Sequence, residues 1–133
     1  MTESVDGLGR RALAQLEADD ADALIEVCDP DVELRPLIAG VSGSEYRGHE
    51  GVRQWFDELS SSFDERRAPI ISIDSPSDDA LVAEIALHLR GRGSGIEIDM
   101  TVYGAGRVRD GLFVWWGFFE ARDEALRELA KHR

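Results

Sequence analysis

Three polar side chains of this chain have the types that proton transfer and anion stabilisation require. Glu120 supplies a carboxylate that accepts or gives a proton, Arg35 a permanent cation, and Tyr46 a hydroxyl donor. We expect Arg35 and Glu120 to face each other across a cavity, as an ion pair or as a site for the polar head of a ligand. If the site is catalytic, Glu120 acts as the base and Arg35 or Tyr46 stabilises an oxyanion.

Each of these side chains also has a purely structural interpretation. A salt bridge between Arg35 and Glu120 would close the cavity, and ion pairs perturb pKa values without any catalysis. Tyr46 is as readily an ordinary packed tyrosine. Glu33 lies two residues before Arg35, on the same face of an expected strand, and serves equally well as its partner. The residue types alone leave these alternatives open.

The remaining chemical groups favour neither a metal nor a cofactor. The three histidines stand without ligand spacing, and we expect His88 to pair with Asp99 on a polar face. The lone Cys28 falls on the buried face of an expected helix, which favours an inert thiol over a nucleophile. The run Gly91–Gly95 links two expected strands and opens no helix, so we interpret it as a hairpin turn and not as a phosphate loop.

The length and the charge of the chain restrict its class. With 133 residues we expect one domain over residues 1–133, large enough for a sizeable core. The formal net charge of −12 disfavours nucleic-acid binding and docking on an anionic membrane. The first residues lack the apolar region of a signal peptide, and no apolar run approaches the roughly 20 residues of a membrane-spanning helix. We therefore expect a cytoplasmic protein.

Apolar periodicity predicts helices in the first half of the chain and strands in the second. Helical spacing is present over 5–16, 21–28 and 49–61, and again over 121–131 at the end. Short strands are expected over 32–37 and 67–74, followed by three long strands between Leu81 and Glu120. This order predicts an α+β fold whose helices gather on one face of an antiparallel meander.

The first long hairpin has a register that its charges support. A two-residue turn at Gly93-Ser94 pairs Arg90 with Glu97 and His88 with Asp99, so that opposite charges lie directly across from each other. The apolar rows of both strands then face the helices.

The facing of the last strand depends on its turn. A two-residue turn at 110–111 would direct Trp115 and Phe119 toward the helices. A three-residue loop at 109–111, which we favour, would instead direct Trp116, Phe118 and Glu120 there. Trp115 and Phe119 then lie on the outer face with Tyr103. Because large aromatic side chains are costly to leave in water, we expect a two-fold homodimer through this outer face.

The order and spacing of several segments resemble those of one family over nearly the whole chain. The segments are Asp29–Pro36 (DPDVELRP), Tyr46–Phe56 (YRGHEGVRQWF), Gly91–Gly95 (GRGSG), Val108–Gly111 (VRDG) and Arg122–Leu126 (RDEAL). Together they are similar to SnoaL-like proteins. The resemblance implies the nuclear-transport-factor-two-like, cystatin-like fold, a cone in which a curved antiparallel or mixed sheet wraps around N-terminal helices, often as a dimer. It also implies the facing that places Trp116, Phe118 and Glu120 inside the cone.

The family that this resemblance indicates contains enzymes and many proteins without a known activity. Its members include polyketide cyclases and, more distantly, ketosteroid isomerases, scytalone dehydratase and limonene epoxide hydrolase. The enzymes typically transfer a proton with a buried carboxylate. At the positions that resemble their acidic residues, this chain carries Gly104 and Arg35. The resemblance thus implies the fold without its familiar acids.

We therefore expect a domain that binds a small, mostly apolar molecule in the cone, with weak or no catalysis. The expected ligand-binding residues are Trp55, Met100, Val102, Gly104, Trp116 and Phe118, with Arg35, Tyr46 and Glu120 orienting the ligand. The alternative is a polyketide-cyclase-like, ketosteroid-isomerase-like or epoxide-hydrolase-like enzyme that uses Glu120 as acid or base and Arg35 or Tyr46 as electrostatic stabilisers. A third possibility is a dimerisation module whose cone is filled by side chains.

Overall fold

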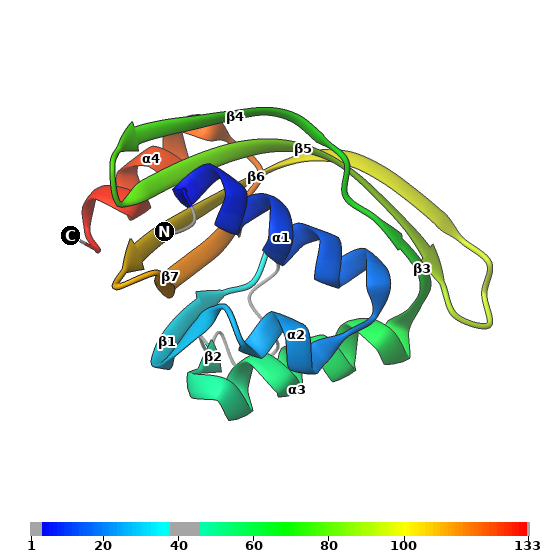
Figure 1. Ribbon diagram of the computed structural model, residues 1–133. Coiled ribbons are helices and arrows are strands. Elements are labelled where there is room, and N and C mark those ends of the chain that lie inside the picture. Colours follow the sequence, from blue (N-terminus) through cyan, green and yellow to red (C-terminus); the bar gives the residue numbers. More distant parts are fainter. Residues whose placement is uncertain (1–3, 38–45, 133) are drawn as a thin grey trace.

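The computed structural model describes residues 4–37 and 46–132, which form helices packed on one curved sheet (Figure 1). The helices are α1 (Val5–Ala18), α2 (Ala21–Ile25), α3 (Gly48–Ser62) and α4 (Arg122–Ala130). The strands are β1 (Cys28–Arg35), β2 (Tyr46–Arg47), β3 (Phe63–Arg67), β4 (Ile70–Ser77), β5 (Ala80–Gly91), β6 (Glu97–Arg109) and β7 (Leu112–Phe119). No helix within the described ranges is long and apolar enough to cross a membrane.

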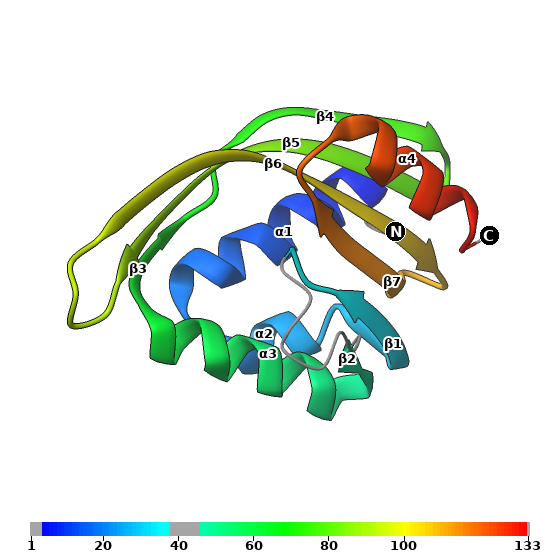
Figure 2. The ribbon, with the colours of Figure 1, turned by 180° about the vertical axis from the view of Figure 1, so that it is seen from behind.

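The strands form one mixed sheet in the order β2-β1-β7-β6-β5-β3, and β4 pairs with the half of β5 that β3 leaves free. Neighbouring strands are antiparallel except β1 and β7, which are parallel. The sheet curves over α1, and α3 lies across its open side, whereas α4 lies on the opposite, convex face (Figures 1 and 2). The predicted α+β architecture, a curved sheet around N-terminal helices, is confirmed, but the expectation that all helices gather on one face is wrong for α4.

Two element boundaries differ from the prediction for local reasons. The strand expected over 67–74 is two strands, β3 and β4, separated at Pro69, because proline cannot donate a backbone hydrogen bond to the neighbouring strand. The second helix ends at Ile25, so Cys28 begins β1 instead of lying on a helix. Cys28 is nevertheless buried, its thiol contacts the Leu24 carbonyl, and burial raises its pKa to about 12. An inert thiol follows from that environment.

The β5–β6 hairpin has the predicted register but a longer turn. Arg90 pairs with Glu97 and His88 with Asp99, as expected from their charges. The Gly91 amide bonds the Ile96 carbonyl, and the Gly95 amide bonds the Gly91 carbonyl, so the loop spans four residues instead of two. A loop longer by two residues preserves the alternation of the strands, which explains why the register was correct.

The β6–β7 hairpin corrects the prediction for its turn but leaves the facing of the last strand as expected. Arg109 pairs with Leu112 across a two-residue turn, in which Asp110 and Gly111 have φ angles of 55° and 79°. Positive φ at both positions is typical of a type I′ turn, so the three-residue loop was wrong. The register then shifts by one residue at Val114, which has no partner between the Val108–Phe113 and Arg107–Trp115 pairs. This bulge restores the phase that turns Trp116 and Phe118 toward the helices.

The outer aromatic side chains of β7 are covered by the chain itself. Trp115 and Phe119 are 2% and 1% exposed, and they pack with Ala125 and Leu129 of α4. Tyr103 is half-buried beside this cluster. The exposed aromatic surface from which we expected a homodimer is therefore absent, because α4 folds back over it.

Arg107 fastens α4 to the convex face. Its side chain is 7% exposed on the outer side of β6. The guanidinium donates to the carbonyls of Leu129 and His132 at 3.0 Å each and pairs with Asp79 at 2.8 Å. These carbonyls lie at and just beyond the C-terminal end of α4, where few carbonyls have a partner within the helix; the Leu129 carbonyl also accepts from the His132 amide at 3.1 Å. Arg107 thus satisfies carbonyls at the end of α4 and ties it to the β4–β5 turn.

We expect Arg107→Met to lower the free energy of unfolding by about 2–3 kcal/mol, because charged hydrogen bonds to buried carbonyls are lost. Urea denaturation followed by tryptophan fluorescence measures this change, since Trp115 lies under α4. The control is Arg109→Met, an exposed position on the same strand, which should change stability by less than about 0.5 kcal/mol. Equal effects of the two substitutions would contradict the role of Arg107.

Candidate functional site

A cavity of about 360 Å³ lies on the concave side of the sheet, between α1, α3 and the curved part of β5 and β6. Alternate residues of the strands face this side because successive side chains of a strand point to opposite faces. The apolar wall includes Leu13 and Leu16 of α1, Trp55 and Leu59 of α3, Ile85, Leu87 and Leu89 of β5, Ile98, Met100 and Val102 of β6, and Phe118 of β7. The third possibility from the sequence, a cone filled by side chains, is therefore wrong.

Four of the expected ligand-binding residues, Trp55, Met100, Val102 and Phe118, line this cavity. Trp55 and Phe118 are stacked, with ring centroids 5.8 Å apart and planes 18° from parallel. Their side chains form an aromatic floor.

Trp116 and Gly104 lie deeper, beside a narrow pocket of about 30 Å³ that shares Ile85 and Phe118 with the main cavity. Trp116 supports the aromatic floor from behind, meeting Trp55 edge-on at 5.5 Å. At Gly104, a Cβ atom would lie 3.3 Å from Ile85 Cδ1 and 3.5 Å from Phe118 Cε1. An acidic side chain at this position would have to displace these neighbours, so the surrounding packing matches the glycine.

Arg35 lies outside the cavity, which corrects the prediction that it faces inward. Leu34 occupies the inward position of β1 and is fully buried, so its neighbour Arg35 points to the convex face. There the guanidinium pairs with Glu124 at 3.6 Å and Glu128 at 3.4 Å, and it lies 4.7 Å from the centroid of the Phe119 ring. Glu33 lies on the same outer face and pairs with Arg47 at 3.7 Å.

Glu120 is also outside the cavity. It follows the last residue of β7 and is exposed in the bend that leads to α4. Because the strand ends at Phe119, the inward phase of Trp116 and Phe118 does not continue to residue 120. Arg35 and Glu120 therefore do not face each other across the cone, and the acid–base arrangement expected from them is absent.

Tyr46 does line the cavity, and its partner is a residue that the sequence analysis missed. The phenol of Tyr46 donates a hydrogen bond of 2.5 Å to Glu58 Oε2, and the Gln54 amide donates to Glu58 Oε1 at 3.2 Å. The hydrogen bond to Glu58 raises the pKa of Tyr46 above its ordinary value, with smaller contributions from burial and from the Glu58 charge. Tyr46 and Glu58 form the carboxylate–phenol pair of the cavity wall.

Arg66 is a cation in the wall, and each of its three guanidinium nitrogens already donates a hydrogen bond to the protein. Its guanidinium donates to the carbonyls of Leu16 at 3.2 Å and Phe63 at 3.0 Å and to the Asp19 carboxylate at 2.7 Å. Asp19 also accepts from Ser60 at 2.6 Å. The Ser60 hydrogen bond and then Arg66 hold the pKa of Asp19 below its ordinary value. Arg66 therefore joins α1, α3 and β3 at the base of the cavity.

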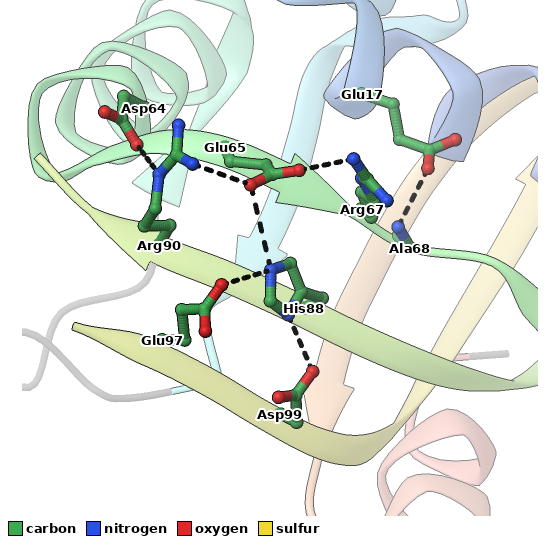
Figure 3. Close-up of polar contacts among 9 residues, drawn as sticks. All are labelled: Glu17, Asp64, Glu65, Arg67, Ala68, His88, Arg90, Glu97 and Asp99. Carbon is green, nitrogen blue, oxygen red and sulfur yellow. Dashed lines mark hydrogen bonds and ion pairs between the residues drawn. The ribbon is translucent and has the colours of Figure 1, made fainter. Parts of the chain in front are cut away.

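A second polar cluster lies on the convex face of the sheet, away from the cavity (Figure 3). Its centre is His88, whose Nδ1 lies 2.6 Å from Asp99 Oδ1, as the register predicts. Arg90 bonds Asp64 at 2.9 Å and Glu65 at 3.3 Å. In the part of the chain that the structure describes, no group of His, Cys, Asp or Glu side chains is arranged to hold a metal ion. We interpret this cluster as a structural network of partly exposed hydrogen bonds and ion pairs.

The position of Glu58 could have been found from helical spacing. Trp55, Leu59 and Ser62 follow each other at four and three residues along α3 and line the cavity together. Glu58 lies three residues after Trp55 and therefore on the same side of the helix. Glu17 lies four residues after Leu13 on α1, so the same spacing could have indicated it; the Ala68 amide donates to it at 3.0 Å (Figure 3). Arg66 gave no such signal, because only the folding of β3 against α1 brings it to the cavity.

Comparisons with known proteins show which family this chain matches and which solved structures have a similar fold. Residues 10–116 match the family model described as SnoaL-like domain. Comparison with curated proteins gives no match.

Solved structures of similar fold come from several bacteria. A Mycobacterium tuberculosis protein in complex with estradiol-17β-hemisuccinate is 19% identical with a TM-score of 0.77, over 92% of this chain and 97% of that one. A putative polyketide cyclase from Xanthomonas campestris is 15% identical with a TM-score of 0.77, over 93% and 95% of the two chains. An NTF2-like protein of unknown function from Burkholderia pseudomallei is 15% identical with a TM-score of 0.76, over 90% and 92%. At these identities the similarity shows the fold.

The pairing of Tyr46 with Glu58 predicts how the tyrosine titrates. The phenolate absorbance reports both tyrosines of the chain, and Tyr46→Phe identifies which transition belongs to Tyr46. In Glu58→Gln that transition should move to lower pH, because the carboxylate that opposes ionisation of the phenol has lost its charge. An unchanged transition would contradict the pairing.

The same shift has a consequence for stability. Because the pKa of Tyr46 is raised in the folded state, Tyr46 contributes to the free energy of unfolding. This contribution is fully present at pH values below the unfolded-state pKa of about 10. It is lost as the pH rises through the folded-state pKa. Tyr46→Phe should remove this alkaline loss, which urea unfolding at several alkaline pH values measures.

Proposed function

This chain belongs to the SnoaL-like domain family, and we propose that it binds one small, mostly apolar molecule in its cone, with weak or no catalysis. The observation that carries the proposal is the open cavity of about 360 Å³, which falls within the usual size range of small-molecule sites, roughly 300–1,000 Å³. Its wall is mainly aliphatic and aromatic, with few polar groups. Such a wall binds through burial of apolar surface and orients the ligand through those few groups.

The similar structure from Mycobacterium tuberculosis supports this proposal, since it holds an estradiol derivative. In this chain the stacked Trp55 and Phe118 would lie against the ligand body. Tyr46 and Glu58 would orient its polar end, in place of the Arg35 and Glu120 that the sequence suggested.

The alternative is an enzyme like the polyketide cyclases, ketosteroid isomerases or epoxide hydrolases, and one observation favours it. Glu58 and Tyr46 form a carboxylate–phenol pair in the cavity wall, and these are groups that transfer protons or stabilise an oxyanion. Glu58, however, is exposed and already accepts hydrogen bonds from Tyr46 and Gln54. A carboxylate becomes an effective general base when its site excludes water, because burial raises its pKa toward the working pH. The exposed position of Glu58 therefore supports binding more than catalysis.

Filling the cavity should abolish binding of an apolar probe. We expect Met100→Trp to weaken the binding of Nile red at least about tenfold, because the larger side chain occupies ligand volume. Thr101→Trp is the matched control, since Thr101 is the next residue of β6 and lies exposed on the opposite face. Fluorescence titration measures both. Nile red binding that is equal in the two variants, or absent in the unmodified protein, would overturn the proposal.

The homodimer also remains a proposal, now through the part of the convex face that α4 leaves open around Tyr103. Its support is the half-buried pair of Glu84 and Tyr103, which lie across from each other on neighbouring strands. Sedimentation should show a species of twice the chain mass that Tyr103→Glu converts to the monomer. A monomer at all concentrations would overturn it.

The single domain over 1–133, the cytoplasmic location and the lack of a cofactor stay predictions from the sequence.

A further inference from the structure

We infer that the cavity selects protonated amines with an apolar body over carboxylic acids of the same shape, and that Glu58 receives the ammonium group. The inference rests on the proposed function, since it concerns the ligand of the same cavity. It comes from the charged groups that the described residues contribute to the cavity wall. The one cation among them is neutralised by a carboxylate of the protein, whereas the two carboxylates have only neutral partners.

The positive charge of the wall is compensated by the protein. The Arg66 side chain is 9% exposed and forms its ion pair with Asp19 at 2.7 Å. Its Nε and Nη1 atoms donate to the carbonyls of Leu16 and Phe63. A ligand carboxylate that entered the cavity would therefore compete with an existing carboxylate for a guanidinium that is already bound. Arg66 offers little attraction to an acidic ligand.

The negative charges of the wall have only neutral partners. Glu58 accepts from the Tyr46 phenol and the Gln54 amide, and Glu17 accepts from the Ala68 backbone amide. Within the described residues, neither carboxylate forms an ion pair with a Lys, Arg or His side chain. An uncompensated carboxylate attracts a cation and repels an anion, and the chain's net charge of −12 acts in the same direction.

Glu58 is placed where an ammonium group and an apolar body can both be bound. It lies three residues after Trp55 on α3, so the carboxylate and the indole are on the same side of the helix. Trp55 and Phe118 present aromatic rings to the cavity, and aromatic faces attract cations as well as apolar groups. When the ammonium group of an amine binds Glu58, its carbon skeleton can therefore pack on the aromatic floor of Trp55 and Phe118. The same placement brings a ligand carboxylate next to Glu58, where like charges repel.

Three indole compounds of nearly equal shape test this inference: tryptamine (cationic), tryptophol (neutral) and indoleacetate (anionic). Calorimetric titration at neutral pH and low salt should give the order tryptamine, tryptophol, indoleacetate, with at least about a tenfold difference in Kd between the first and the last. Raising the ionic strength should reduce this difference, because the carboxylate is accessible to solvent.

Glu58→Gln isolates the charge, because the amide oxygen still accepts the Tyr46 hydrogen bond. In this variant tryptamine should bind about fivefold more weakly, indoleacetate more tightly, and tryptophol as before. The control is Asp57→Asn, which removes the same charge from the adjacent residue of α3, outside this cavity. Equal effects of the two variants would show that only the overall charge matters and would overturn the role of Glu58.

The outcomes separate this inference from the function on which it rests. If Nile red binds but tryptamine does not bind more tightly than indoleacetate, the charge preference is wrong and the apolar site stands. If neither Nile red nor any of the indoles binds, the proposed function itself is wrong.

Discussion

The one-residue bulge at Val114 decides how the aromatic side chains of β7 are divided between the two faces of the sheet. Without it, the two-residue turn at Asp110 and Gly111 would carry Trp115 into the cone and Trp116 out of it. With it, Phe118 lies in the floor of the cavity and Trp116 packs behind that floor, while Trp115 lies under α4. Since fully burying such a side chain stabilises a fold by roughly 1.5–3 kcal/mol, both faces must be covered at once, and α1, α3 and α4 cover them.

The charge of the cavity wall follows from the division of the side chains between the two faces of the sheet. The concave side of β5 and β6 carries only apolar residues along the cavity, so charged groups reach it from the surrounding helices and from β3. Of these, Arg66 is held by the carbonyl of Leu16 and by Asp19 and belongs to the framework. Tyr46, Glu58 and Glu17 remain as polar groups of an otherwise mainly apolar wall. This wall, and not the far side of the sheet, is where ligand chemistry would take place.

The sequence indicated four apolar residues that line the cavity, and it misplaced two polar residues; ligand binding by any of them stays a prediction. Trp55, Met100, Val102 and Phe118 were found because strand alternation and helix spacing are local properties. Arg35 and Glu120 were misplaced for the opposite reason. Leu34 takes the inward position of β1, and β7 ends before residue 120. The alternation of apolar and polar residues within one segment reveals neither the facing of β1 nor the end of β7. Glu58 was missed although its spacing from Trp55 on α3 was available.

What the sequence determined by itself is the order of the main helices and long strands, the register of β5 against β6, and the family of the fold. These depend on periodicity, on turn residues and on charge pairs that are near each other along the chain. Only the tertiary structure decided that Val114 forms a bulge and that α4 covers Trp115 and Phe119. It also decided that Arg66 forms an ion pair with Asp19. The physical reason is that burial and charge compensation depend on residues far apart in sequence, such as Asp19 and Arg66, which only the folded chain brings together.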